Sequence, residues 1–219
     1  MFLTQLDQKR LDHLATDDSF LAHLKMIYED FYRRVISPRQ VMDPYFKGNE
    51  VIAYFSMEFG IHESLPFFAG GLGVLAGDHL KSSSNISLPM VGICLLYIRG
   101  YFRQYLNHEG WQQEDYPETD SFHIPMQRAH GIDGKPLRVA ATGPLGEIYA
   151  NVWKINIGRI PLYLLDTNTH ENSPEAQNIT ERLYTGNLIQ RLSQEVILGI
   201  GGMRALKAMG YYPKVIHMN

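Results

Sequence analysis

Residues 69–78 read AGGLGVLAGD and join a glycine-rich turn to the start of a helix-forming segment. A predicted apolar strand at residues 51–56 lies shortly before this turn. The first N–H groups of a helix have no acceptor within the helix, and the helix dipole concentrates positive charge at the same end. The turn therefore predicts a binding site for an anion such as phosphate, although its spacing is equally compatible with a tight turn that holds no ligand.

Two common nucleotide-binding patterns do not describe this turn. A P-loop needs a lysine followed by serine or threonine, and neither stands at the required place. Gly71 and Gly73 are followed by Ala76 before the next glycine, Gly77, so the pattern G-x-G-x-x-G is absent as well. A phosphate bound here would be recognised by a different arrangement of backbone donors.

Carboxylates flank the turn and open a second interpretation. Glu58 and Glu63 precede it, and Asp78 follows it. Paired carboxylates can perform acid–base chemistry, as they do in glycosidases. Glu58 either supports the turn or takes part in the chemistry, and both alternatives stay open at this point. Asp78 is interpreted as a charge that complements the helix dipole.

Three predicted elements position these residues. A strand at residues 51–56, a helix at 72–85 and a second buried strand at 90–97 form a β–α–β unit, so the two strands are expected to be parallel. Ligands of parallel sheets collect at the carboxyl ends of the strands. This arrangement places Glu58 beside the glycine-rich turn.

The rest of the chain predicts further elements and two domains. The elements are helices at residues 6–14 and 18–35, a strand at 101–106, a polar segment at 107–136, an antiparallel hairpin of 148–157 and 160–166, a helix start at Ser173, a long helix at 180–209 and a strand at 215–219. Gly199, Gly201 and Gly202 are unfavourable inside a helix, so close packing or a local break is expected there. The predicted domains are N-terminal helices with a linker at residues 1–50 and an α/β domain at 51–219.

The composition excludes several classes of protein. The 219 residues carry a net charge of −3, so no basic surplus favours nucleic acid or an anionic membrane surface. The longest uncharged apolar stretch, residues 86–98, contains Pro89 and is too short to span a bilayer. The single cysteine, Cys94, has no partner for an internal disulfide, which favours a cytoplasmic location.

Neither the aromatic residues between positions 97 and 111 nor the polar segment at 107–136 predicts a defined site. Five aromatic residues between positions 97 and 111 are expected to lie mostly in the core, with a few free to stack on sugar rings. They are Tyr97, Tyr101, Phe102, Tyr105 and Trp111. The polar segment that follows contains histidines and acids without the fixed spacing of metal ligands. No metal site is predicted.

A series of motifs occurs in order along the chain. They are YFSMEFGIHESLP (54–66), AGGLGVLAGDHLKSSS (69–84), GYFRQ (100–104), GWQQEDYP (110–117), PLYLLDT (161–167), RLYTGN (182–187) and QEVILGIGGMRALKAMG (194–210). Together they resemble the bacterial and archaeal α-glucan phosphorylases, relatives of glycogen and maltodextrin phosphorylase, over about residues 51–219. An ordered string of motifs is far more specific than any one of them.

The resemblance implies a fold, an activity and a set of binding residues. The fold is α/β, an incomplete Rossmann-like glycosyltransferase lobe with an inserted antiparallel hairpin region and N-terminal helices. The activity is transfer of a terminal α-1,4-glucosyl unit to inorganic phosphate, which gives glucose 1-phosphate. Gly70, Gly71 and Leu72 are then expected to face the phosphate and the glucosyl group, with Glu58 in a supporting role. No residue is assigned as catalytic.

The resemblance also implies a cofactor and partners. The family binds pyridoxal phosphate through a lysine of its C-terminal lobe, so that lysine is not expected in this chain. The expected partners are an α-1,4-glucan, phosphate and the missing C-terminal lobe, and an exposed apolar face favours a homo-oligomer. The chain is therefore expected to be a fragment that is inactive alone. Two alternatives remain: a nucleotide-sugar glycosyltransferase lobe similar to glycogen synthase, and a non-catalytic truncated product that binds glucan.

Overall fold

The computed structural model describes residues 6–37, 45–65, 67–118, 124–184 and 187–219. The chain divides into two compact units, Met1–Gln40 and Val41–Asn219. The linker predicted before residue 50 lies largely in residues 38–44, outside the described ranges.

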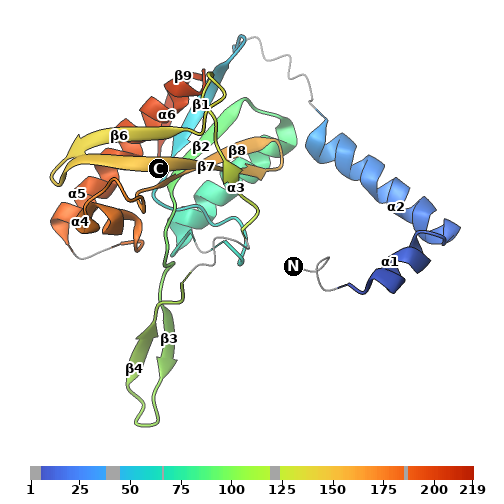
Figure 1. Cartoon of the computed structure of the whole chain (residues 1–219), viewed down its shortest axis with the longest axis horizontal. Coiled ribbons are helices and arrows are strands. Elements are labelled where there is room, and N and C mark those ends of the chain that lie inside the picture. Colours follow the sequence, from blue (N-terminus) through green and yellow to red (C-terminus); the bar gives the residue numbers. More distant parts are fainter. Residues whose placement is uncertain (1–5, 38–44, 66, 119–123, 185–186) are drawn as a thin grey trace. The chain divides into compact units, whose positions relative to one another are not determined.

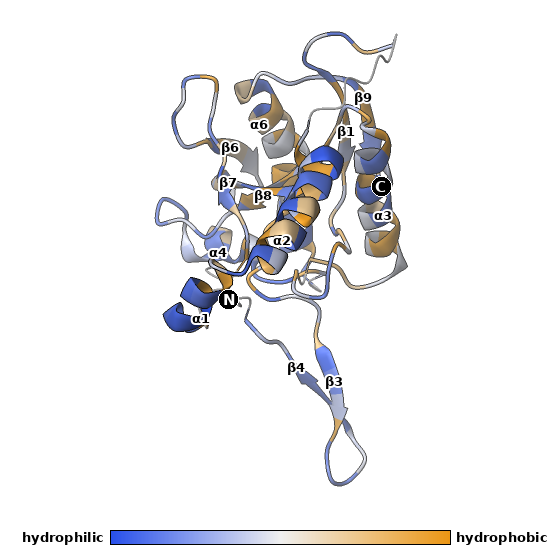
Figure 2. Ribbon diagram, turned by 90° about the vertical axis from the view of Figure 1, so that its right-hand side faces the viewer, coloured by the Kyte–Doolittle hydropathy of each residue, from blue (hydrophilic) through white to orange (hydrophobic). Residues whose placement is uncertain are grey.

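The first unit is helical, as the sequence predicts. Its elements are α1 (Gln8–Leu14), α2 (Asp18–Phe31) and the π-helical turn Tyr32–Ile36. Asp17 fixes the start of α2, because its carboxylate accepts hydrogen bonds from the N–H groups of Ser19 and Phe20. Apolar residues recur along α2 at helical spacing, with polar residues between them (Figure 2). No residue of α1 or α2 is buried.

The second unit is built on a seven-stranded sheet (Figure 1). The strands are β1 (Glu50–Phe55), β2 (Met90–Leu95), β5 (Gln127–Arg128), β6 (Arg138–Gly143), β7 (Gly146–Ile157), β8 (Ile160–Asp166) and β9 (Tyr212–Met218). Their order is β5-β7-β8-β2-β1-β9, and β6 also pairs with β7. The four strands β8, β2, β1 and β9 are parallel, whereas β7 runs antiparallel to its neighbours.

Helices cover both faces of the parallel strands, which explains why β1 and β2 are apolar runs and not alternating ones. The helix α3 (Gly71–Ile86) buries Ala76 and Leu80 in the core on one face. The helices α5 (Leu188–Val196) and α6 (Gly202–Ala208) lie on the opposite face (Figure 1). The predicted parallel β–α–β unit is confirmed, and so is the hairpin that β7 forms with β8.

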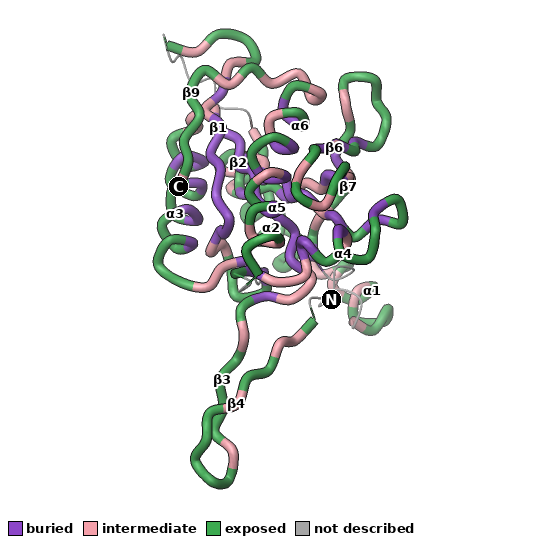
Figure 3. The backbone as a smooth tube through the Cα atoms, turned by 90° about the vertical axis from the view of Figure 1, so that its left-hand side faces the viewer, coloured by how far each residue is buried: buried purple, intermediate pink, exposed green. Residues whose placement is uncertain are grey.

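A separate two-stranded hairpin departs from the prediction. Its strands β3 (Arg103–Leu106) and β4 (Gln112–Asp115) project away from the body of the unit (Figure 3). The sequence predicts only the first strand and treats the second as a loop, because QQED carries no apolar alternation. The short strands β5 and β6 are also missed.

The hairpin overturns most of the aromatic prediction. Tyr97 is fully buried, but Tyr101, Tyr105 and Trp111 are exposed, and Phe102 is half-buried. A hairpin that projects alone has no opposing layer that can bury its side chains. The expectation of a mostly buried aromatic group is therefore wrong for this segment.

The long helix expected at residues 180–209 begins later, at Leu188, and runs without a gap through α5, a π-helical turn (Ile197–Gly201) and α6 to Ala208. Before it, the chain forms α4 (Pro174–Gln177) and a 3-10 turn (Asn178–Thr180). Ser173 caps α4, as predicted.

The three glycines give the expected break and close packing. Gly199 and Gly201 lie within the π-helical turn. A Cβ atom added at Gly202 would lie 2.7 Å from Phe55 Cε1 and 2.8 Å from Ile93 Cγ2. Only a glycine lets this helix approach the sheet so closely.

Candidate functional site

The carboxyl ends of the parallel strands bring the predicted site residues together. β1 runs directly into the segment that contains Glu58, and the glycine-rich turn precedes α3 beside it. The segment before α5 brings Tyr184 to the same edge, 126 positions after Glu58. The site is therefore assembled from three separate stretches of the chain.

Glu58 is the centre of this assembly, and its side chain is almost wholly used. The residue is only 2% exposed. Its Oε2 accepts hydrogen bonds from the N–H groups of Ala69 (2.6 Å) and Gly70 (3.2 Å). Its Oε1 accepts a hydrogen bond from the Tyr184 hydroxyl (2.6 Å). These contacts favour support of the turn over acid–base chemistry, because both carboxylate oxygens are already bound.

Close backbone contact fixes the start of α3 against the segment that follows Glu58. The Gly60 N–H donates a hydrogen bond to the Gly73 carbonyl oxygen at 2.7 Å. A Cβ atom added at Gly73 would lie 2.7 Å from Glu58 Oε2, and one added at Gly77 would lie 2.1 Å from the Gly60 carbonyl oxygen. Gly73 and Gly77 thus serve packing.

The glycines of the turn itself have the opposite surroundings. Gly70 is the N-cap of α3, in an extended conformation, and no side chain caps the helix. A Cβ atom added at Gly70 or Gly71 would meet no atom within 4 Å. Gly71 and Leu72 are exposed, and none of the described hydrogen bonds supplies an acceptor for their N–H groups. Of the predicted residues, Gly71 and Leu72 offer open donors, whereas the Gly70 N–H is held by Glu58.

A pocket of about 410 Å³ lies at the same edge of the sheet. Its lining includes Ser56, Met57, Arg191 and Asn219. The Asn219 side-chain amide donates to Ser56 Oγ (3.2 Å) and to the Leu72 carbonyl oxygen (3.3 Å). The residue that follows β9 thereby joins the end of the predicted strand at residues 51–56 to the first turn of α3.

A second pocket, of about 590 Å³, is lined in part by Tyr184. Three further aromatic residues line it: Tyr101, Phe102 and Tyr116. The Arg182 guanidinium lies 4.2 Å from the centre of the Tyr116 ring. Residues 185 and 186 of the RLYTGN motif lie outside the described ranges.

Burial sets the protonation of the tyrosines at this edge. Burial, together with the hydrogen bond to Glu58, raises the pKa of Tyr184 to about 12. Burial also raises the pKa of Tyr97, whose hydroxyl donates to the Met57 carbonyl oxygen at 2.9 Å. Both hydroxyls therefore remain protonated donors at neutral pH.

The other flanking carboxylates do not join the site. Glu63 is exposed. The first turn of α3 contains no acidic residue, and Asp78 lies beyond it. The Asp78 Oδ1 atom is 4.0 Å from Lys81 Nζ on the surface. The expected dipole role of Asp78 is wrong, because the helix begins at Gly71 and the dipole acts within the first turn.

Sequence reasoning missed Tyr184 and Arg191 as parts of the site. Tyr184 stands in the RLYTGN motif, which was the available signal, but nothing in its spacing points to Glu58. Arg191 has no local signal, since it reads as an ordinary helical cation. Its guanidinium lies 5.3 Å from the centre of the Tyr184 ring.

Two other features, a metal-ligand cluster and a membrane-spanning helix, are absent from the described residues. In the parts of the chain that the structure covers, no three histidine, cysteine, aspartate or glutamate residues are grouped so that they would hold a metal ion. Within the same parts, no helix has the length and apolar character needed to cross a membrane.

Comparison with known proteins places the chain among phosphorylases. It is 39% identical over 219 residues to maltodextrin phosphorylase of Thermococcus litoralis, which covers 99% of this chain and 26% of that protein. It is 40% identical over 229 residues to glycogen phosphorylase of Mycobacterium tuberculosis, with the same two shares. Glycogen phosphorylase of Aquifex aeolicus is 34% identical over 211 residues, 96% of this chain and 30% of that protein.

A separate family match covers the beginning of the chain. Residues 1–65 match the family described as "Protein of unknown function (DUF3417)". The chain spans about a quarter of the length of the first two of these phosphorylases. These similarities extend over nearly the whole chain and agree with the ordered motifs: the chain belongs to the α-glucan phosphorylase family.

Proposed function

We propose that this chain supplies the phosphate-facing wall of an α-glucan phosphorylase of the cytoplasm. The reaction transfers a terminal α-1,4-glucosyl unit to inorganic phosphate and gives glucose 1-phosphate. The observation that carries the proposal is the Glu58-held turn, with the open N–H groups of Gly71 and Leu72 at the carboxyl edge of the sheet. Residues 51–219 would form the partial lobe that carries this wall, and residues 1–50 a separate helical region.

The two open N–H groups would act on the substrate phosphate. Backbone donors that are held in place stabilise negative charge without reorganising during the reaction. Glu58 supports this role because it holds Ala69 and Gly70, which immediately precede the open donors. The positive end of the α3 dipole adds to the attraction.

The aromatic pocket beside Tyr184 would contact the glucan. Tyr101, Phe102 and Tyr116 present apolar faces there, and Gln190 adds an amide. A sugar ring offers apolar C–H faces and polar hydroxyls, which match such a mixed lining. The α-1,4-glucan and phosphate are therefore the proposed substrates.

The cofactor of the family would be held outside this chain. Pyridoxal phosphate needs a lysine that can form a Schiff base. No lysine lines either of the two pockets among the described residues, and Lys81 on α3 faces Asp78 at the surface. The residues that line these two pockets therefore do not fit the cofactor. A C-terminal lobe is the proposed partner that would supply it.

Replacement of Gly71 by proline tests the role of its N–H. Gly71 is the first residue of α3, where proline is well tolerated, and Gly70 before it is extended. Gly71→Pro removes one donor, and Gly71→Ala is the matched control that keeps it. Inorganic phosphate is titrated into the 219-residue chain while amide resonances are followed by NMR. We expect about tenfold weaker binding for Gly71→Pro and unchanged binding for Gly71→Ala.

Three outcomes would contradict parts of the proposal. If phosphate leaves the Gly71 and Leu72 resonances of the unmodified chain unchanged, the phosphate-facing wall is refuted. If a nucleotide sugar shifts them and phosphate does not, the glycosyltransferase alternative replaces it. The chain alone is expected to release no glucose 1-phosphate from a maltooligosaccharide with phosphate, and measurable release would refute the need for a second lobe.

A further inference from the structure

Tyr184 has an unusual backbone conformation for its residue type. Its φ angle is +57°, and the other non-glycine residue with positive φ in the described ranges is Ser87. Ser87 ends α3 as a left-handed C-cap, which is an ordinary use of this conformation. Tyr184 ends no helix, so its conformation needs another cause. Strained residues of this kind persist where the surroundings hold them, and they cluster at functional sites.

The side chain of Tyr184 is held from two sides. Its hydroxyl donates to Glu58 Oε1 at 2.6 Å. Its ring lies 5.3 Å from the Arg191 guanidinium, whose Nε in turn donates to Glu195 Oε1 at 2.8 Å. The tyrosine therefore links α5 to the carboxylate that holds the glycine-rich turn.

The Tyr184 hydroxyl completes the binding of the Glu58 carboxylate. The two backbone donors, Ala69 and Gly70, both reach Oε2, and the tyrosine is the donor described for Oε1. Without it, a buried carboxylate oxygen would lack its partner, and the carboxylate would be free to turn toward water. That rotation would loosen the two bonds that hold the turn.

We propose that Tyr184 is a positioning residue that orients the Glu58 carboxylate and thereby sets the direction of the Gly71 and Leu72 N–H groups. An effect of Tyr184 on phosphate binding rests on the proposed function. An effect of Tyr184 on the conformation of the turn does not depend on any ligand.

The experiment compares Tyr184→Phe with Tyr97→Phe. Both variants lose one tyrosine hydroxyl near this edge, but Tyr97 donates to the Met57 carbonyl oxygen and not to the Glu58 carboxylate. Amide proton shifts of Ala69 and Gly70 are measured first without ligand. We expect them to move upfield in Tyr184→Phe, because their hydrogen bonds to the carboxylate weaken, and to stay in place in Tyr97→Phe.

Phosphate titration of the same variants gives the second measurement. Tyr184→Phe is expected to bind inorganic phosphate about three- to tenfold more weakly than the unmodified chain, and Tyr97→Phe with equal affinity. Unchanged amide shifts in Tyr184→Phe would overturn the proposal, and so would equal loss in both variants. If the unmodified chain binds no phosphate, the proposed function fails, while the ligand-free shifts still decide whether Tyr184 positions the turn.

Discussion

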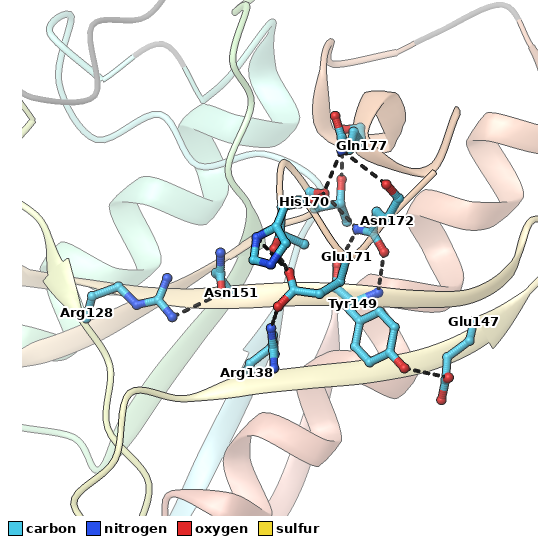
Figure 4. A network of polar contacts seen from close by, with 11 residues as sticks. Arg128, Arg138, Glu147, Tyr149, Asn151, His170, Glu171, Asn172 and Gln177 are labelled. Atoms are coloured by element: carbon cyan, nitrogen blue, oxygen red, sulfur yellow. Dashed lines mark hydrogen bonds and ion pairs between the residues drawn. The ribbon is translucent and has the colours of Figure 1, made fainter. Parts of the chain in front are cut away.

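Two segments follow parallel strands at the same edge of the sheet and differ in whether their polar groups have hydrogen-bond partners within the chain. After β1, the glycine-rich turn is held by Glu58 from one side and leaves the N–H groups of Gly71 and Leu72 open. After β8, residues 167–180 form a loop that includes α4 and the 3-10 turn, and its polar side chains bond to one another and to the backbone (Figure 4). The first segment leaves two backbone donors open, and the second uses its donors for structure.

The loop after β8 is closed by amide side chains. The Asn172 Nδ2 donates to the carbonyl oxygens of Tyr149 (2.8 Å) and Thr167 (2.7 Å), and its Oδ1 accepts from the Tyr149 N–H (2.9 Å). The Gln177 amide donates to the carbonyl oxygens of Thr169 (3.0 Å) and Asn172 (3.1 Å). Buried polar groups that are fully paired give rigidity and leave no donor for a ligand. One edge of the sheet thus holds both a fully bonded segment and a turn with open donors.

The largest effect is expected where α3 meets the backbone of Gly60. A Cβ atom at residue 77 would lie 2.1 Å from the Gly60 carbonyl oxygen, and neither backbone can move far. Gly77→Ala is therefore expected to lower the free energy of unfolding by about 3 kcal/mol or more. Denaturant unfolding measures this loss.

Gly71→Ala is the control for that substitution, because its Cβ would meet no atom within 4 Å. We expect this variant to be as stable as the original chain or more stable by up to about 1 kcal/mol. Equal destabilisation by the two substitutions would contradict the contrast between packing glycines and turn glycines.

A smaller loss is expected from opening the loop after β8. Asn172→Ala leaves the Tyr149 N–H and two carbonyl oxygens without their partner, in a residue that is 6% exposed. It is expected to lower the free energy of unfolding by about 2–3 kcal/mol, with phosphate binding unchanged. Asn168→Ala, at an exposed position of the same loop, should change little. Weaker phosphate binding by the folded Asn172→Ala chain would show that the two segments are coupled.

The smallest effect is a pH dependence at the end of β8. Burial raises the pKa of Asp166 above its ordinary value of 3.8, against the opposing effect of hydrogen bonds from Asn168 and Trp153. The folded chain therefore holds this proton to higher pH than the unfolded chain. The resulting stability is present below pH 3.8 and is lost as the pH rises through the folded pKa.

Asp166→Asn removes this ionisation and isolates its contribution. The free energy of unfolding is measured for both chains from below pH 3.8 to neutral pH. Relative to the variant, the original chain should lose stability as the pH rises. If the difference in the free energy of unfolding between the two chains does not change with pH, the pKa of Asp166 is the same in the folded and unfolded chain, and the expected effect of burial is wrong.

Local patterns predicted the elements that carry the site. The apolar runs of β1 and β2, with a helical segment between them, were sufficient for a parallel β–α–β unit, and that unit is observed. The helix cap at Ser173 follows from residue type and spacing as well. The strand β4 gave no such signal, because its four polar residues pair with β3 without facing a core.

The sequence by itself determined that a glycine-rich turn opens α3 at a strand end, because these features depend on neighbours along the chain. Only the tertiary structure decided that Glu58 supports the turn, that the Gly70 N–H is occupied, and that Tyr184 completes the carboxylate. The last of these contacts joins residues 126 positions apart. Such a contact depends on the order of the strands and on how closely α5 and α3 approach the sheet. Residue spacing along the chain does not encode those distances.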